Sequence, residues 1–218
     1  NWGFTATPGP DGSMFGGGIV SPSATGGWPT SAGAFQTTYG GPANPGVPAD
    51  VGIIRLSPDG RTRLYATYLG GTGLEQPHSL VADANGNLVI AGRTNSKNTF
   101  PGTTIGPVGS GDYDIFVTKL NATGTAIIGS LKIGGSGDDG VNITSNRSSG
   151  ARSLMRSYGD DGRSEVILDA QNNILLASCT RSSNFPTQGN PFQTTLRGEQ
   201  DGVVIKINPT CTSVIWST

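Results

Sequence analysis

Short apolar segments alternate along the chain with turns rich in glycine, asparagine and aspartate. The clearest example is DANGNLVIAGRT (83–94), in which an Asn-Gly turn leads into the apolar run at 88–92. Turns of this composition favour β-hairpins because their residues accept positive φ. No long segment has the 3.6-residue apolar period of an amphipathic helix, so the pattern predicts an all-β protein with little helix.

Three sequence anchors recur along the chain, which indicates an internal repeat. The first anchor is an apolar strand that ends in Gly-Gly, found in LYATYLGG (64–71) and GSLKIGG (129–135) and shortened in VIWST (214–218). The second is a turn followed by a strand, found in PDGSMFGGG (10–18), ANGNLVIAG (84–92) and QNNILLAS (171–178). The third is an aspartate followed by an apolar strand, found in DVGIIRL (50–56), DIFVTKL (114–120) and DGVVIKI (201–207). A unit of 64 residues with two loop insertions accounts for the whole chain.

One unit provides four strands, which we letter A to D, with A ending in Gly-Gly and D beginning at the recurring aspartate. In the second unit the expected strands are 64–69, 78–83, 87–92 and 114–120. Four antiparallel strands in a tandem repeat are typical of β-propeller blades. The predicted fold is therefore a β-propeller of four-stranded antiparallel blades, with about three blades visible.

The repeat also sets the expected blade boundaries. The first blade, lacking its A strand, is expected at 1–62, the second at 63–125, and the third, with a 22-residue insert, at 126–210. Residues 211–218 are expected to form the A strand of a following or ring-closing blade. Propellers typically have about four blades or more. We therefore expect either a window of a larger propeller, which we favour, or a ring that an oligomeric partner completes.

The runs YATYLGG, DANGNLVIAGRTNSKNTFPG and DIFVTKLNATG resemble the SBBP β-propeller repeat of bacterial surface and secreted proteins. The resemblance covers nearly all of the chain, although the second unit lacks the F-Q-T-T element present at 35–38 and 192–195. It implies an exported, non-enzymatic module, extracellular or on the bacterial cell surface. Such a module acts in binding or adhesion, or as a structural scaffold. A carbohydrate-binding or polysaccharide-degrading propeller domain is the alternative function.

The composition narrows the possible partners. The net charge of −1 gives no electrostatic reason to expect nucleic acid. No apolar run approaches the roughly 18 residues that span a membrane. We expect no cofactor and no metal. The expected partners are a protein or a surface glycan, together with the remaining blades of the same polypeptide or an oligomeric partner that closes the ring.

Asp83, Asn85 and Asn87 place side-chain oxygens at alternate positions, as at the start of a calcium loop. Such a loop also needs a bidentate acidic residue about twelve positions from its start. Thr94 and Asn95 stand in that region instead. We therefore interpret the stretch as a hairpin turn that enters a buried strand.

Asp50, Asp114 and Asp201 recur at the start of strand D. An active site is needed once, so residues present in every unit favour a structural role, and we assign no catalytic residue. We expect these side chains to cap backbone N–H groups of a turn. The functional alternative is a ring of carboxylates around one mouth of the channel.

The other candidates for chemistry are isolated. His78 is the only histidine, which excludes a zinc site with two or three histidines in the chain, and no motif around it supports nucleophilic catalysis. Asp138 and Asp139 are candidate paired carboxylates for glycoside cleavage, although a turn is the favoured interpretation. Cys179 and Cys211 form either one disulfide or two free thiols.

Surface features complete the sequence hypotheses. The insert at 142–163 carries four arginines and two aspartates, and is either a partner- or glycan-contacting loop or a tolerated surface insertion. Asn-x-Ser/Thr sites occur by chance at Asn121, Asn142 and Asn146. Rings that could stack on sugars are Trp2, Trp28 and Trp216. Packing is favoured for Trp28, because it precedes a proline where the other two units have phenylalanine.

Overall fold

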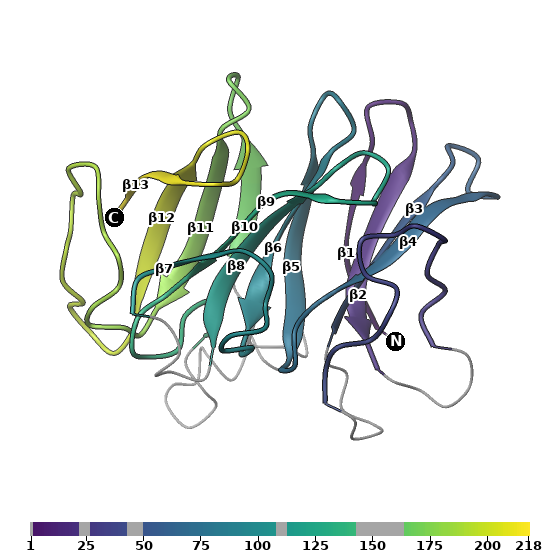
Figure 1. Ribbon diagram of the computed structural model, residues 1–218. Coiled ribbons are helices and arrows are strands. Elements are labelled where there is room, and N and C mark those ends of the chain that lie inside the picture. The colour runs from purple at the N-terminus through teal and green to yellow at the C-terminus, as the bar shows by residue number, and fades with distance from the viewer. Residues whose placement is uncertain (1, 22–26, 43–49, 108–112, 143–163) are drawn as a thin grey trace, which may run out of the picture.

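The computed structural model describes residues 2–21, 27–42, 50–107, 113–142 and 164–218. Within these ranges the chain forms strands and no helix, and the strands make three sheets that stand side by side (Figure 1). The prediction of an all-β protein is therefore confirmed.

Each sheet contains four antiparallel strands in chain order. The first sheet consists of β1 (Trp2–Pro8), β2 (Met14–Val20), β3 (Asp50–Leu56) and β4 (Arg63–Leu69). The second consists of β5 (Glu75–Ala82), β6 (Leu88–Thr94), β8 (Asp114–Leu120) and β9 (Ile127–Ile133), and the short β7 (Thr103–Ile105) runs parallel to β9 at its edge. The third consists of β10 (Ser164–Leu168), β11 (Ile174–Thr180), β12 (Asp201–Ile207) and β13 (Val214–Ser217).

The strands expected for the second unit are all present. The strand predicted at 114–120 is β8 without change, and that at 87–92 is β6, shifted by one or two residues. The strand predicted at 78–83 begins earlier and is β5. The strand predicted at 64–69 is β4.

The sheets are offset by one strand from the sequence units. The A strand β4, which the repeat assigns to the second unit, pairs with β3 and completes the first sheet. In the same way β13 pairs with β12. The cause is a tight turn between strands D and A, in which Gly60 and Gly124 have left-handed φ of 70° and 67°. Each sheet therefore has the strand order B-C-D-A, and the expected boundaries after 62, 125 and 210 cut the three sheets before their last strands.

Two apolar clusters fill the spaces between the sheets. The cluster between the first and second sheets includes Phe15, Ile53, Leu80, Leu88 and Phe116. The cluster between the second and third includes Val89, Val117, Val166, Leu176 and Ile205. The second sheet buries both of its faces, which explains why every residue of β8 is buried. Strand β5 contacts β1 on one side and β10 on the other, so the first strands of the three sheets are neighbours (Figure 1).

Candidate functional site

The first and second sheets meet through the turn that joins β8 to β9. Gly124 O in this turn accepts a hydrogen bond from Phe35 N at 2.8 Å, and Ala122 O accepts one from Arg55 Nη1 at 2.7 Å. The Tyr65 ring lies against Gly124, since a methyl group on that glycine would be 2.6 Å from Tyr65 Cγ. We call this contact between the D–A turn of one sheet and the preceding sheet a sheet junction.

The second and third sheets meet through an equivalent junction. Lys119 Nζ, which stands at the position of Arg55, donates to Pro209 O at 2.9 Å in the turn between β12 and β13. Cys211 in the same turn is completely buried, and its Sγ lies 3.3 Å from Val117 O. The D–A turn of the following sheet is therefore the contacting element in both junctions.

Large and small residues are exchanged between the two junctions. In the first, the Tyr65 ring packs on Gly124. In the second, Cys211 stands at the turn position of Gly124 with a similar φ of 57°, and its backbone packs on Gly129, which stands at the position of Tyr65. The exchange keeps the two sheets in contact, as close packing of protein interiors requires.

The third sheet has residues equivalent to those of a junction on the face that is turned away from the second sheet, but there they are exposed. Val117 is 0% exposed within its junction, whereas the equivalent Val204 is 43% exposed. Phe35 packs against the core between the first two sheets, whereas the equivalent Phe192 is 95% exposed. We call this surface the open face, and it consists of Ile167, Leu175, Ala177, Phe192, Val204 and Trp216.

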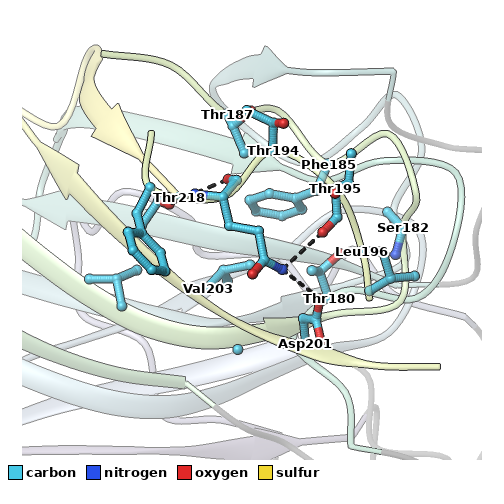
Figure 2. A pocket seen from close by; sticks show the side chains of 14 residues that line it. Thr180, Ser182, Phe185, Thr187, Thr194, Thr195, Leu196, Asp201, Val203 and Thr218 are labelled. Atoms are coloured by element: carbon cyan, nitrogen blue, oxygen red, sulfur yellow. Dashed lines mark hydrogen bonds between the residues drawn. The ribbon is translucent and has the colours of Figure 1, made fainter. Parts of the chain in front are cut away.

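A pocket of about 310 Å³ lies beside the open face (Figure 2). Gln193 organises its polar side: the backbone N donates to Thr218 Oγ1 at 2.8 Å, and Nε2 donates to Thr195 O and Asp201 Oδ2, both at 2.9 Å (Figure 2). Its apolar side includes Phe192 and Val204 of the open face, together with Phe185, Leu196 and Val203. The size is at the lower end of the range for ligand pockets, which begins at about 300 Å³.

The first sheet shows what fills the equivalent groove. There Gln36 Nε2 reaches Asp50 Oδ2 at 3.4 Å, as Gln193 does in the third sheet. An extended segment crosses Gln36, because Tyr68 N donates to Gln36 O and Gly70 N donates to Gln36 Oε1, both at 3.0 Å. That segment continues through Gly-Gly into the second sheet. In the first sheet this groove therefore holds an extended Gly-Gly segment that leads into the next sheet.

Two of the three recurring aspartates have the predicted capping role. Asp50 Oδ2 accepts a hydrogen bond from Gly40 N at 2.8 Å, and Asp201 Oδ2 accepts one from Arg197 N at 2.7 Å. The F-Q-T-T segments place these N–H groups, since both donors lie two positions after the last threonine of that element.

The capping prediction for Asp114 stays a prediction, because residues 108–112 of the loop before it lie outside the described part of the chain. Within the described ranges this carboxylate accepts no backbone N–H, and Lys132 Nζ lies 3.8 Å from its Oδ2. The second unit has no F-Q-T-T element, which is the segment that precedes the donors to Asp50 and Asp201. Asp50 and Asp201 have equivalent partners in equivalent loops, which favours the structural role over a ring of carboxylates around a channel mouth.

The DANGN stretch is a hairpin turn, as predicted. Asp83 N donates to Asn87 O at 2.9 Å, and Gly86 adopts a φ of 79°. Asp83 Oδ1 accepts hydrogen bonds from Asn85 N and Asn87 N, and Oδ2 pairs with Lys119 Nζ at 2.8 Å. Burial acts to raise the pKa of Asp83, but Lys119 and Asn87 outweigh it and hold that pKa below its usual value. Both carboxylate oxygens are thus engaged by groups of the hairpin and β8.

Asp138 and Asp139 contact different neighbours. Asp138 Oδ2 lies 3.5 Å from Arg181 Nη1, whereas Asp139 is fully buried and accepts a hydrogen bond from Ser182 Oγ at 2.8 Å. They do not face a common cleft as a glycosidase pair does. His78 lies on β5 at the bulge between Pro77 and Ser79.

The two cysteines are free thiols, and both are buried. Burial raises the pKa of Cys211 to about 12, which makes the thiol unreactive. No group of three or more metal-ligating side chains is found within the described ranges.

The remaining candidates have packing roles or fall outside the described residues. Trp28 packs on Gly52, since a methyl group there would be 2.9 Å from Trp28 Cε2, and this confirms the packing interpretation. Asn121 Oδ1 caps its own turn by accepting from Thr125 N at 2.8 Å. Trp216 belongs to the open face. The side chain of Trp2, Asn146 and nearly all of the insert at 142–163 lie outside the described part of the chain.

Sequence reasoning missed two features of this site. The exposure of Phe192 cannot be read from F-Q-T-T, because the same motif is covered in the first sheet and open in the third. The equivalence of Glu75 to Asp139 was the second: both buried acids follow a Gly-Gly pair in the spacing G-G-x-G-x-acid, and that repeated spacing is the signal that could have revealed it.

Comparison with known proteins does not assign the chain to a family. No family model matches the chain, and no curated protein matches it. The resemblance to the SBBP repeat therefore stays a prediction. Within the described ranges there is no helix long and apolar enough to cross a membrane.

Proposed function

We propose that the chain is a non-enzymatic β-propeller module of the SBBP type, in which each sheet is one blade. The module serves binding, adhesion or scaffolding in an exported protein of the bacterial surface. The support is architectural: three sheets share one strand order, their first strands are neighbours, and consecutive sheets pack through equivalent junctions. Radial repetition of four-stranded sheets is the defining property of propellers.

The use of the acidic residues supports a role without catalysis. Asp83 and Asp169 occupy equivalent hairpin turns and pair with equivalent lysines at 2.8 Å. Asp50 and Asp201 hold equivalent loops in place. Side chains that could carry acid–base chemistry are thus repeated, and each repeat uses them to stabilise the fold.

The open face carries the proposal on partners. Every position that is exposed on it has an equivalent that lies in a junction between two sheets, as Val204 and Val117 illustrate. The open face also has the polar group of a junction. Lys206 stands at the position of Lys119, whose Nζ donates a hydrogen bond to the D–A turn of the next sheet. The occupant of the open face is therefore a further four-stranded sheet, supplied by other blades of the polypeptide or by an oligomeric partner.

A charge placed on the open face tests this proposal in the protein as its source assembles it. If a further sheet covers Val204, then Val204→Asp buries an unpaired charge and should lower the free energy of unfolding by more than about 4 kcal/mol. The matched control is Ile215→Asp. Ile215 is 44% exposed at a position that is also exposed in the first two sheets, at Leu64 and Ile128. It should change stability by about 0.5 kcal/mol at most.

Equal, small effects of Val204→Asp and Ile215→Asp would show that Val204 faces solvent in the assembled protein. The open face would then be free for another ligand, and the proposal of a covering sheet would be lost.

Carbohydrate binding is the second candidate, and Phe192 favours it. Its ring is 95% exposed beside a pocket lined with threonine hydroxyls, and aromatic rings next to polar groups suit sugars. A glycan array with the wild-type chain and Phe192→Ala tests this directly, with Trp216→Ala and Trp28→Ala as controls. Binding that Phe192→Ala abolishes would favour a lectin, whereas no binding on the array would remove the candidate.

A further inference from the structure

A buried acidic residue follows the Gly-Gly pair at the start of both the second and the third sheet. Glu75 accepts hydrogen bonds from Gly71 N at 3.0 Å and from Thr94 Oγ1 and Ser96 Oγ, both at 2.6 Å. The carboxylate is 2% exposed. Three donors therefore hold it in one orientation at the edge of the first junction.

Asp139 has the same set of donors at the second junction. It accepts hydrogen bonds from Gly135 N and Ser182 Oγ, both at 2.8 Å, and from Thr180 Oγ1. Because these donors are the sequence equivalents of those around Glu75, the two acids are one structural feature that occurs twice.

Each of these acids faces the aspartate that begins strand D of the preceding sheet. A methyl group on Gly70 would lie 2.6 Å from Asp50 Oδ1 and 2.7 Å from Glu75 Oε2. A methyl group on Gly134 would likewise touch both Asp114 Oδ1 and Asp139 Oδ2. In each junction, the Cβ position of one glycine therefore lies against two carboxylate oxygens from different acids.

One oxygen of each pair is buried without a partner. Asp50 is 0% exposed and Asp114 is 5% exposed. The Oδ1 atom of each has no hydrogen-bond partner among the described residues. A buried, ionised oxygen that is beside a second carboxylate and lacks a donor is strongly unfavourable.

The surrounding charges do not balance the acids. Five carboxylates gather at the two junctions: Asp50, Glu75, Asp114, Asp138 and Asp139. Lys132 from β9 faces both Asp114 and Glu75, and its Nζ also donates to Ser96 O at 3.0 Å. Arg181 from the loop after β11 pairs with Asp138. Tyr39 faces Asp50 from the loop before β3. Burial, with the Asp50 charge, raises the pKa of Tyr39 to about 12, so its side chain adds no charge near pH 7. Among the residues that the structure describes, two cations therefore face these five acids.

We propose that each sheet junction is a proton-binding site, in which Asp50 with Glu75, and Asp114 with Asp139, share one proton between their facing oxygens. The proton supplies the donor that the unpartnered Oδ1 atom lacks. Proton release places two negative charges between neighbouring sheets and loosens their packing, so the protein becomes less stable as the pH rises.

The pKa shifts of the two aspartates agree with this geometry. Burial, together with the Glu75 charge, raises the pKa of Asp50 to about 7. Burial and the acids at 138 and 139 outweigh Lys132 and raise the pKa of Asp114 to about 6. Both folded-state pKa values lie above the unfolded value near 3.8, so the protonated acids contribute their full stability to the fold below that pH. This stability is lost as the pH rises through the folded values.

A proton explains the sites better than a metal ion does. Glu75 and Asp139 are already surrounded by N–H and O–H donors, whose hydrogens point at the carboxylate and not at a cation. Lys132 also brings a positive charge to within 3.8 Å of Asp114 Oδ2, which disfavours a second cation there.

Thermal melting of the 218-residue chain as a function of pH tests the proposal. We expect the wild-type Tm to fall by roughly 5–10 °C between about pH 5 and pH 8. Asp50→Asn places a permanent N–H donor opposite Glu75, so this variant should have a higher Tm than the wild type at pH 8 and a weaker pH dependence. Asp114→Asn should behave in the same way at the second junction.

Asp201→Asn is the matched control, because Asp201 begins strand D of the third sheet and has no facing acid within the described ranges. It should keep the wild-type pH dependence. A wild-type Tm that is constant or rises between pH 5 and 8 would overturn the proposal, as would Asp50→Asn with an unchanged pH dependence. Stabilisation by calcium chloride at pH 8 that Asp50→Asn removes would overturn it in favour of a cation site.

Discussion

Replacing Gly124 by alanine perturbs the turn that joins the first two sheets. An L residue at its φ of 67° costs about 1–2 kcal/mol relative to glycine. The new methyl group would also lie 2.6 Å from Tyr65 Cγ and Cε2, and such overpacking costs about 1–3 kcal/mol. We therefore expect Gly124→Ala to lower the free energy of unfolding by about 2–5 kcal/mol.

The two costs are separable, because the chain offers a control for each. Gly60 occupies the equivalent turn of the first sheet with a φ of 70°, and a methyl group there would meet nothing within 4 Å. Gly60→Ala should therefore cost the backbone term alone, about 1–2 kcal/mol. In a Tyr65→Ala background the clash disappears, so Gly124→Ala should also cost only about 1–2 kcal/mol there.

Urea unfolding followed by far-ultraviolet circular dichroism measures all four variants and the wild type. The coupling between positions 65 and 124 should be about 1–3 kcal/mol. If Gly124→Ala costs no more than Gly60→Ala, or if the effects at 65 and 124 add, the turn does not pack on Tyr65 and the sheet junction is incorrect.

One further substitution and one thiol-labelling experiment test the second sheet and its junction with the third. Asp83→Ala removes the carboxylate that pairs with the buried Lys119, and should lower the free energy of unfolding by about 3–5 kcal/mol near pH 7. The loss should shrink below about pH 4, since a carboxylate whose pKa is lowered by folding gives up its contribution as the pH falls through that pKa; a loss that stays constant in acid would contradict the ion pair. Cys179 and Cys211 should not react with a chromogenic thiol reagent in the native chain, and both should react in denaturant. Fast reaction of Cys211 in the native chain would show that the β12–β13 turn is not buried against the second sheet.

The strands were predictable because their signals are local. The Asn-Gly turn before β6 and the aspartate that begins β8 are both visible in the sequence, and the repeat confirms them three times. The offset of the sheets by one strand was missed, because the turn at Gly124 was not recognised as a hairpin between strands D and A. A left-handed glycine between two apolar strands is the relevant signal.

The contacts between sheets could not be predicted from one sequence. Glu75 and Asp50 are 25 residues apart and meet only because neighbouring sheets pack face to face and bring both acids to Gly70. The motif F-Q-T-T has one sequence and two environments, since Phe35 is covered by the second sheet and Phe192 is exposed. Burial of such residues depends on the next sheet, which no local pattern describes.

The open face of the third sheet is, on our proposal, the uncovered half of a sheet junction. An experimental structure of the protein as its source organism assembles it tests this most directly. We predict a four-stranded antiparallel sheet over Val204, with its D–A turn against Phe192 and a carbonyl oxygen of that turn within hydrogen-bond distance of Lys206 Nζ. A structure in which Val204 and Phe192 face solvent, or contact a helix or a sugar, would contradict the proposal.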